Sequence, residues 1–211
     1  TFRDAIDALA ESRHTLRTPI LEAVQAIASC FARGGKLLIC GNGGSAADAQ
    51  HFACEFVGRF KAERRGLPAI ALNADTSILT AWSNDVGYET VFARQVEALG
   101  NHGDILLGIS TSGRSPNLIR AFETARAHGI RTVALLGGTG GDCLPLADIP
   151  LLVPSHDTQH VQEVQILLVH LVCDLVERRL AYSSSARSSG RSPHDRRSDR
   201  RRVSLVKEVV A

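Results

Sequence analysis

Two segments of the 211-residue chain place side chains suited to acid–base chemistry or metal binding at helical spacings. His51 and Glu55 are four residues apart, so on a helix they share one face. Gln162 and His170 are eight residues apart, again close to one face. Such sets can bind a divalent metal or supply an acid and a base. Alternatively, the first pair could be a surface pair, and His170, within the apolar run ILLVHLV, a buried histidine with a polar partner.

Two loops have compositions suited to holding an anion. The first, GNGGSAADAQ (41–50), is rich in glycine and opens into a helix, so its backbone can approach a ligand and the helix N-terminus offers free N–H groups. The second, STSGRS (110–115), surrounds Gly113 with hydroxyl groups that can donate to phosphate oxygens. Either loop alone could be an ordinary strand-to-helix turn, with Ser115 as an N-cap. Neither matches the dinucleotide-binding or Walker pattern.

Each of these loops follows a short apolar segment that is typical of a buried strand. Strands that alternate with helices and are apolar throughout predict a parallel sheet covered on both faces. The expected class is therefore α/β, with a central, mostly parallel sheet flanked by helices in three layers. The two loops should then meet at the carboxyl edge of the sheet. Strands are expected at 36–40, 68–73, 105–110, 132–137 and 149–153, and helices at 4–33 with a break near Pro19, 45–57, 75–83, 88–99, 115–128 and 159–181.

Composition indicates an ordinary globular domain. Hydrophobic residues make up 44% of the chain and charged residues 22%, and no apolar run approaches the roughly 20 residues that span a bilayer. The polar first residues do not resemble a signal peptide. The five cysteines are scattered without a C-x-x-C pair, which favours buried thiols in the reducing cytoplasm over a disulfide framework or a zinc ribbon.

The C-terminal segment differs from the rest in charge. From Ser183 onward there are eight Lys or Arg and three Asp or Glu, a balance of +5, which leaves 2 − 5 = −3 for the preceding residues. Residues 1–182 are expected to form the domain, and the Ser/Arg-rich residues 183–211 a disordered tail. A nucleic-acid-binding arm is the less favoured interpretation of that tail.

The strings CGNGGSAADAQHFACEFVGRF and LLGISTSGRSPN resemble the SIS (sugar isomerase) domain and, more closely, the bacterial phosphoheptose isomerases. The resemblance runs from about residue 4 to about residue 181. It implies the three-layer SIS fold and a cytoplasmic homotetramer with sites between subunits. It also implies isomerisation of sedoheptulose 7-phosphate to D-glycero-D-manno-heptose 7-phosphate through an enediol, the first step of ADP- or GDP-heptose biosynthesis for lipopolysaccharide.

The same resemblance implies residue roles. The family motifs H-F-x-x-E and Q-E-x-x-x-x-x-x-H match at His51, Glu55, Gln162 and His170, which implies one zinc per subunit held by these four. Glu55 and His170 are implied as the catalytic pair, with Glu55 as the base. Where family members have an acid or small residue followed by Arg, this chain has Gln159 and His160, a departure that affects substrate positioning. Substrate contacts are implied for Asn42, Gly43, Gly44, Glu55, Asn84, Asp85, Ser110, Thr111, Ser112, Ser115 and Gln162. Arg59 could be a further anion contact or, equally, a solvated arginine at a helix end.

Two other functions are compatible with the sequence. The stretch LPAIALNADTSILTAWSND resembles non-catalytic SIS proteins that bind the bacterial replication initiator, but their matched helices lack the acid/histidine pair that Glu55 and His170 form here. A sugar-phosphate sensor would need a DNA-binding domain, and no helix-turn-helix segment remains outside the predicted domain. The expected partners are therefore a sugar-phosphate substrate and further copies of the chain, without a membrane or nucleic acid.

Overall fold

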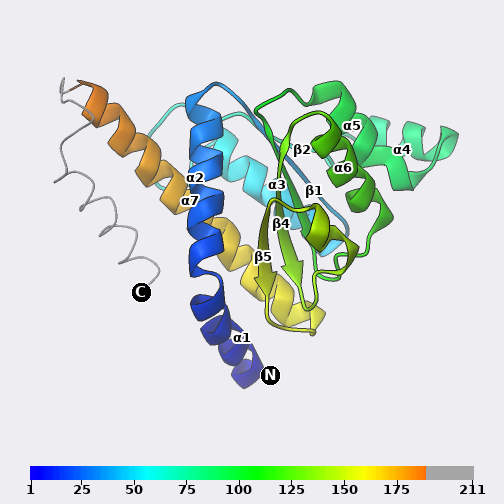
Figure 1. Cartoon of the computed structure of the whole chain (residues 1–211), viewed down its shortest axis with the longest axis horizontal. Helices are drawn as coiled ribbons and strands as arrows, with labels where there is room; N and C mark the ends of the chain where they lie inside the picture. The colour runs from blue at the N-terminus through cyan, green and yellow to red at the C-terminus, as the bar shows by residue number, and fades with distance from the viewer. Residues whose placement is uncertain (189–211) are drawn as a thin grey trace.

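The computed structural model describes the backbone of residues 1–188 and the side chains of residues 1–181. Within this part of the chain, five strands form one parallel sheet in the order β2-β1-β3-β4-β5 (Figure 1). The strands are β1 (Leu37–Gly41), β2 (Ala69–Ala71), β3 (Ile105–Ser110), β4 (Arg131–Gly137) and β5 (Ile149–Val153). The helices are α1 (Phe2–Thr15), α2 (Arg17–Ala32), α3 (Gly44–Val57), α4 (Thr76–Asp85), α5 (Val91–Leu99), α6 (Pro116–Ala127) and α7 (Thr158–Ser188), with short 3₁₀ helices η1 (Tyr88–Thr90) and η2 (Gly141–Leu146).

Helices cover both faces of the sheet, which confirms the predicted three-layer α/β class. Alternate strand residues point to opposite faces. Ile39 and Leu107 belong to the core shared with α1, α2, α3 and α7, whereas Leu38 and Leu106 belong to the core shared with α5 and α6. Figure 1 shows α2 and α7 on one side of the sheet and α4, α5 and α6 on the other. Burial on both faces explains why the strands are apolar at nearly every position.

The order of the strands places the two predicted loops side by side. From β1 the chain moves outward to β2 and then returns to β3 on the other side of β1, and both neighbours pair with β1 in parallel. The loops after β1 and β3 therefore leave the same edge of the sheet in opposite directions. Such a switch point is where open α/β sheets bind ligands.

Several predicted boundaries differ from those in the structure. The first helical segment breaks at Leu16, which ends α1 and precedes α2, and Pro19 lies in the first turn of α2, where its missing N–H is not needed. Edge strand β2 is only three residues long. Helix α7 continues to Ser188, seven residues past the predicted end at 181, and residues 189–211 of the predicted tail lie outside the described part of the chain.

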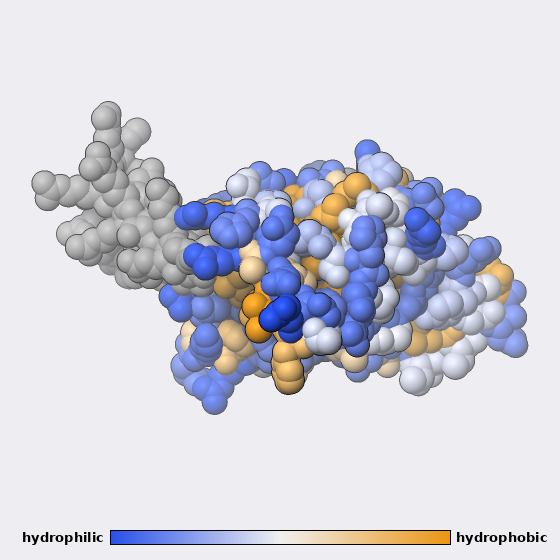
Figure 2. Space-filling view, turned by 90° about the horizontal axis from the view of Figure 1, so that it is seen from below, coloured by the Kyte–Doolittle hydropathy of each residue, from blue (hydrophilic) through white to orange (hydrophobic). Residues whose placement is uncertain are grey.

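The surface and the cysteines have the character that the composition predicts for an ordinary globular domain. The face in Figure 2 is largely hydrophilic with small hydrophobic patches. All five cysteines are free thiols and four of them are buried, Cys54 being the exposed one. Among residues 1–188, none of the helices combines the length and the apolar character that crossing a bilayer requires.

Candidate functional site

Helices α3 and α7 lie side by side and run in the same direction, which aligns the two predicted residue sets. Near their starts, a β-carbon added at Gly44 would come within 2.6 Å of Gln162 Nε2. Further along, Nε2 of His51 lies 3.3 Å from Nε2 of His170. Between these two contacts the chain advances seven residues along α3 and eight along α7, so the two helices rise by nearly the same length.

The predicted acid–base residues meet where the two helices come together. Oε1 of Glu55 lies 3.0 Å from Nε2 of His51, one turn earlier on α3. The rings of His51 and His170 have centroids 5.0 Å apart. The side chains of His51 and Glu55 are 41% and 21% exposed, so a ligand can reach them. His51 thus lies between the carboxylate and the second imidazole.

The donor types of this cluster fit a zinc ion. Nε2 of His51 carries either one proton or one lone pair, so it can form one good hydrogen bond. Yet it lies close to two groups, Glu55 and His170. A cation among the three groups would satisfy all of them, since imidazole nitrogen and carboxylate oxygen are ordinary zinc ligands. The separations of 3.0 and 3.3 Å lie near the edge length of about 3.3 Å expected for tetrahedral bonds of about 2.0 Å. However, among the side chains of residues 1–181, no group of three or more His, Cys, Asp or Glu residues is arranged so that it could hold a metal ion.

Asp48 is an acidic residue of this cluster that the sequence analysis missed. It lies one turn before His51 on α3, at a spacing that could have identified it. Burial raises the pKa of its carboxyl group, and the charges of His51 and His170 partly counteract this rise. The contact between α3 and α7 therefore combines two imidazoles with two carboxyl groups.

In the first loop, Asn42 is a structural link between three segments. Its side-chain amide forms two reciprocal hydrogen bonds of 2.9 Å with the amide of Asn117, in the first turn of α6. The hydroxyl of Tyr88 in η1 donates to Asn42 Oδ1 at 2.9 Å. Gly43 follows with φ of 57° and ψ of −122°, a conformation that requires glycine. Asn117 and Tyr88 are further site residues that the sequence analysis did not identify.

The hydroxyl groups of the second loop differ in their environment. Ser110 is buried, and its Oγ accepts a hydrogen bond of 3.0 Å from the backbone N–H of Gly113. Ser112 is exposed, and its Oγ accepts a longer bond of 3.3 Å from Arg114 N–H. Ser115 precedes α6 but its side chain makes no capping hydrogen bond, so its hydroxyl remains available to a ligand. Thr111, between Ser110 and Ser112, is half-buried.

Other predicted substrate residues lie further from the histidine pair along the chain. Asn84 and Asp85 end α4 and are exposed, and Asn84 Nδ2 donates to Asp85 Oδ1 at 2.8 Å. Helix α4 packs on η1, whose Tyr88 reaches Asn42. Through this short segment, Asn84 and Asp85 are connected to the first loop.

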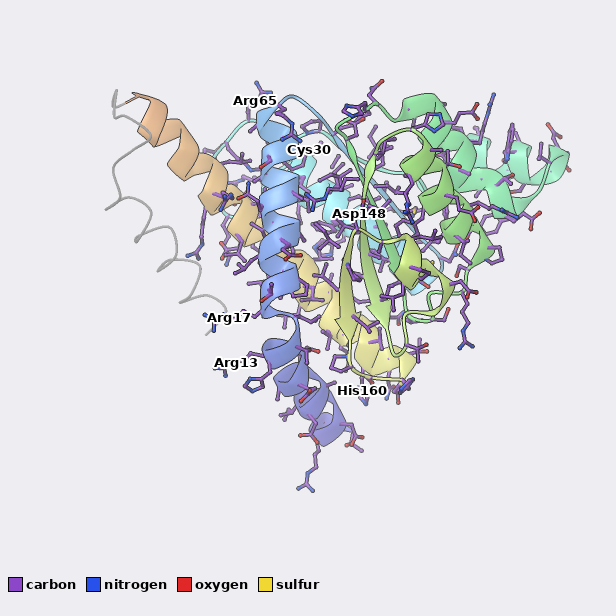
Figure 3. The ribbon with its side chains drawn as sticks, viewed as in Figure 1. Arg13, Arg17, Cys30, Arg65, Asp148 and His160 are labelled. Carbon is purple, nitrogen blue, oxygen red and sulfur yellow. The ribbon has the colours of Figure 1, made fainter. Side chains whose placement is uncertain are left out.

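The remaining candidates have partners on their own segments. Arg59 is exposed and pairs with Glu63 at 3.0 Å. His160 lies in the first turn of α7 (Figure 3) and is buried, with Nδ1 2.8 Å from Glu163 Oε2. Its neighbour Gln159 has Nε2 3.4 Å from His160 Nε2.

Comparison with known proteins identifies the family. The SIS domain model matches residues 1–137. The phosphoheptose isomerase of Helicobacter pylori (strain P12) is 52% identical over 178 residues, which cover 84% of this chain and 93% of that protein. The enzyme of Roseiflexus sp. (strain RS-1) is 58% identical over 171 residues, 80% of this chain and 87% of that protein.

Solved structures agree with this assignment. A phosphoheptose isomerase from Neisseria gonorrhoeae has a TM-score of 0.80 and 44% identity, with 84% of this chain and 95% of that chain covered. One from Francisella tularensis has a TM-score of 0.82 and 43% identity, with 84% and 94% covered. The chain therefore belongs to the SIS domain family and, within it, to the phosphoheptose isomerases.

Proposed function

We propose that this chain isomerises sedoheptulose 7-phosphate to D-glycero-D-manno-heptose 7-phosphate. The relatives described above, named phosphoheptose isomerase, support this activity. The observation that carries it is the convergence of Glu55 and His170 on His51, because a ketose–aldose conversion needs two proton-transferring groups at one place. Because Glu55 and His170 are both present, we favour a catalytic function over binding of the replication initiator.

The reaction moves a proton from C1 of the ketose to C2 through an enediol. Glu55 removes the proton from C1 and returns it to C2, while His170 moves protons between the two oxygens. Each well-placed acid–base group typically contributes a factor of about 10²–10⁴ in rate. His51, which contacts both residues, fixes their relative positions.

The phosphate group is held by the two loops at the carboxyl edge of the sheet. The exposed hydroxyl of Ser112 and the uncapped hydroxyl of Ser115 can donate to its oxygens. The start of α6 adds backbone N–H groups and a partial positive charge. Binding energy from this end of the substrate helps to orient the reacting carbons.

We also propose one zinc per subunit, held by His51, Glu55, His170 and Gln162. The first three side chains lie together, whereas Gln162 lies against Gly44 and would have to reorient to join them. Bound there, zinc would stabilise negative charge on the substrate oxygens. A coordinated carboxylate is a weaker base, so proton transfer by Glu55 requires that its oxygen be free.

We further propose that the protein is a cytoplasmic homotetramer whose product enters heptose biosynthesis for lipopolysaccharide. Helix α1 extends away from the sheet (Figure 1), and its Phe2 and Ile6 side chains are 92% and 62% exposed. Apolar side chains exposed in this way are typical of surfaces that another protein covers. A second copy of the chain is the occupant that the proposal assigns to them.

The test is an assay of the purified protein on sedoheptulose 7-phosphate, with and without added zinc after chelation. Fructose 6-phosphate and ribulose 5-phosphate serve as matched ketose phosphates. We expect turnover of the heptulose in large excess over the others, with deuterium from D₂O incorporated at carbon. Preferred turnover of a shorter sugar would contradict the substrate assignment. No turnover of any sugar, together with capture of the replication initiator, would support the non-catalytic alternative.

A further inference from the structure

The turn that follows α3 is folded around one buried carboxylate, that of Glu177 on α7. Glu177 is 3% exposed. Its oxygens accept hydrogen bonds of 3.0, 3.0 and 2.8 Å from three successive backbone N–H groups, those of Phe60, Lys61 and Ala62. A buried carboxylate with this many donors is held firmly, because breaking any one of the bonds would leave a polar group unpaired.

The same carboxylate is tied to the end of α3 by Arg64. Nε of Arg64 donates to Glu177 Oε1 at 2.8 Å. The guanidinium also donates to the carbonyl oxygens of Phe56 at 2.9 Å and of Glu55 at 2.8 Å. Arg64 thus satisfies carbonyls in the last turn of α3 that have no helical partner, including the backbone of the proposed base.

The turn held by Glu177 carries an aromatic ring that packs on the proposed catalytic imidazole. The rings of Phe60 and His170 are stacked, with centroids 5.6 Å apart and an interplanar angle of 24°. Glu177 lies seven residues after His170 on α7, two helical turns away on the same face. One helix therefore carries both the imidazole and the carboxylate that fixes the ring against it.

We propose that Glu177 is a positioning residue for the isomerisation. By holding the 60–62 turn it keeps Phe60 stacked on His170, and through Arg64 it fixes the end of α3 beside Glu55. The two proton-transferring groups, which come from different helices, thereby keep a constant relative position. This inference rests on the proposed function only in taking Glu55 and His170 as the reacting pair.

The first test is spectroscopic and needs no activity. The ¹H–¹³C resonances of the His170 ring are recorded in the full-length protein, as purified and after chelation. Phe60→Leu removes the ring current directly, and we expect Glu177→Gln to shift the same resonances in the same direction. Asp104→Asn is the matched control, because Asp104 is equally buried and accepts two backbone N–H groups, from Lys36 before β1 and from Asn101 before β3.

The second test separates kcat from KM. A misplaced reacting group lowers the rate of the chemical step, so Glu177→Gln and Phe60→Leu should each lower kcat on the order of tenfold while KM changes less than about twofold. Glu177→Asp should recover part of the loss, and Asp104→Asn should leave kcat unchanged. His170 resonances and a kcat that are unchanged in Phe60→Leu would overturn the proposal even if Glu177→Gln failed to fold. A wild-type protein without isomerase activity would instead contradict the proposed function, while the spectra would still decide whether Glu177 positions the ring.

Discussion

The side-chain amides of Asn42 and Asn117 form two reciprocal hydrogen bonds of 2.9 Å across 75 residues of sequence. This pair joins the loop after β1 to the start of α6, the helix that follows the serine loop. Because Asn117 is 3% exposed, the bonds are shielded from water. The distance between the two anion-suited loops is therefore set by a pair of side chains and by the sheet beneath them.

Asn117→Ala should weaken substrate binding without abolishing catalysis. The substitution removes both bonds between the amides, each worth about 0.5–1.5 kcal/mol, and leaves half-buried Asn42 with Tyr88 as its remaining partner. We expect KM to rise about tenfold and the melting temperature to fall. Tyr88→Phe removes a single bond and should have a smaller effect. A folded Asn117→Ala protein with the wild-type KM would show that the Asn42–Asn117 pair does not fix the distance between the two loops.

The sequence predicted the parts of this site that depend on local spacing. His51 and Glu55 could be placed on one face because a helix fixes neighbours four residues apart. The glycine and serine loops were recognised because each follows a fully apolar strand. In contrast, Asn117 and Tyr88 gave no local signal, since their partner Asn42 is remote in sequence and only the strand order brings it near.

Contacts between helices could not be predicted from the sequence either, because the residues that meet are remote along the chain. His51 and His170 are 119 residues apart, and their contact depends on the packing of α3 on α7. The perturbed environment of Asp48 depends on burial, which no spacing reveals. Similarly, the break at Leu16 arises where α1 ends and α2 begins, whereas the sequence pointed to Pro19, which the first turn of a helix accommodates.

Glu55→Gln should abolish most of the turnover while preserving substrate binding. The amide keeps the shape of the side chain but cannot accept a proton from carbon, so we expect kcat to fall by a factor of about 10²–10⁴. The measurement is steady-state kinetics together with deuterium incorporation from D₂O. The matched control is Glu63→Gln, an exposed glutamate on the turn after α3. Normal isomerisation by Glu55→Gln would remove this residue from the role of base.

Ser112→Ala and Ser110→Ala should affect different quantities. Ser112 is exposed and available to phosphate, and losing one hydrogen bond to a charged group, worth about 1.5–3 kcal/mol, should raise KM at least tenfold with little change in melting temperature. Ser110 is buried and accepts from Gly113, so its replacement should lower the melting temperature as well. Ser77→Ala, at an exposed position of α4, is the control. If KM stays constant in Ser112→Ala, the phosphate is held elsewhere.

Replacing either histidine of the α3–α7 contact should reduce zinc binding. Metal affinity depends on the number of ligands, so His51→Ala and His170→Ala should each lose most of the bound zinc, measured as metal content after dialysis. The wild-type protein should hold about one zinc per chain. His128→Ala serves as the control, because His128 is exposed on another helix end and bonds to Thr124 O at 2.9 Å. Equal zinc content in all four proteins would contradict the proposed site.

The stability contributed by Glu177 should disappear in acid. Burial by itself would raise the pKa of this carboxyl group, but hydrogen bonds from the turn and from Arg64 outweigh it and lower the pKa below the usual value of 4.5. A lowered pKa in the folded state means that the stabilisation is complete above the unfolded-state value and is lost as the pH falls through the folded-state value. At pH 7, Glu177→Gln should therefore reduce the free energy of unfolding by about 3 kcal/mol.

Below pH 4.5 the difference in the free energy of unfolding between wild type and Glu177→Gln should shrink, because the wild-type carboxylate becomes protonated and loses its charge. Urea unfolding of both proteins across this pH range measures it. Glu63→Gln, which alters an exposed ion pair, should show little difference at any pH. A penalty for Glu177→Gln that remained constant down to the acid limit would mean that shape, and not the negative charge, stabilises the turn around Glu177.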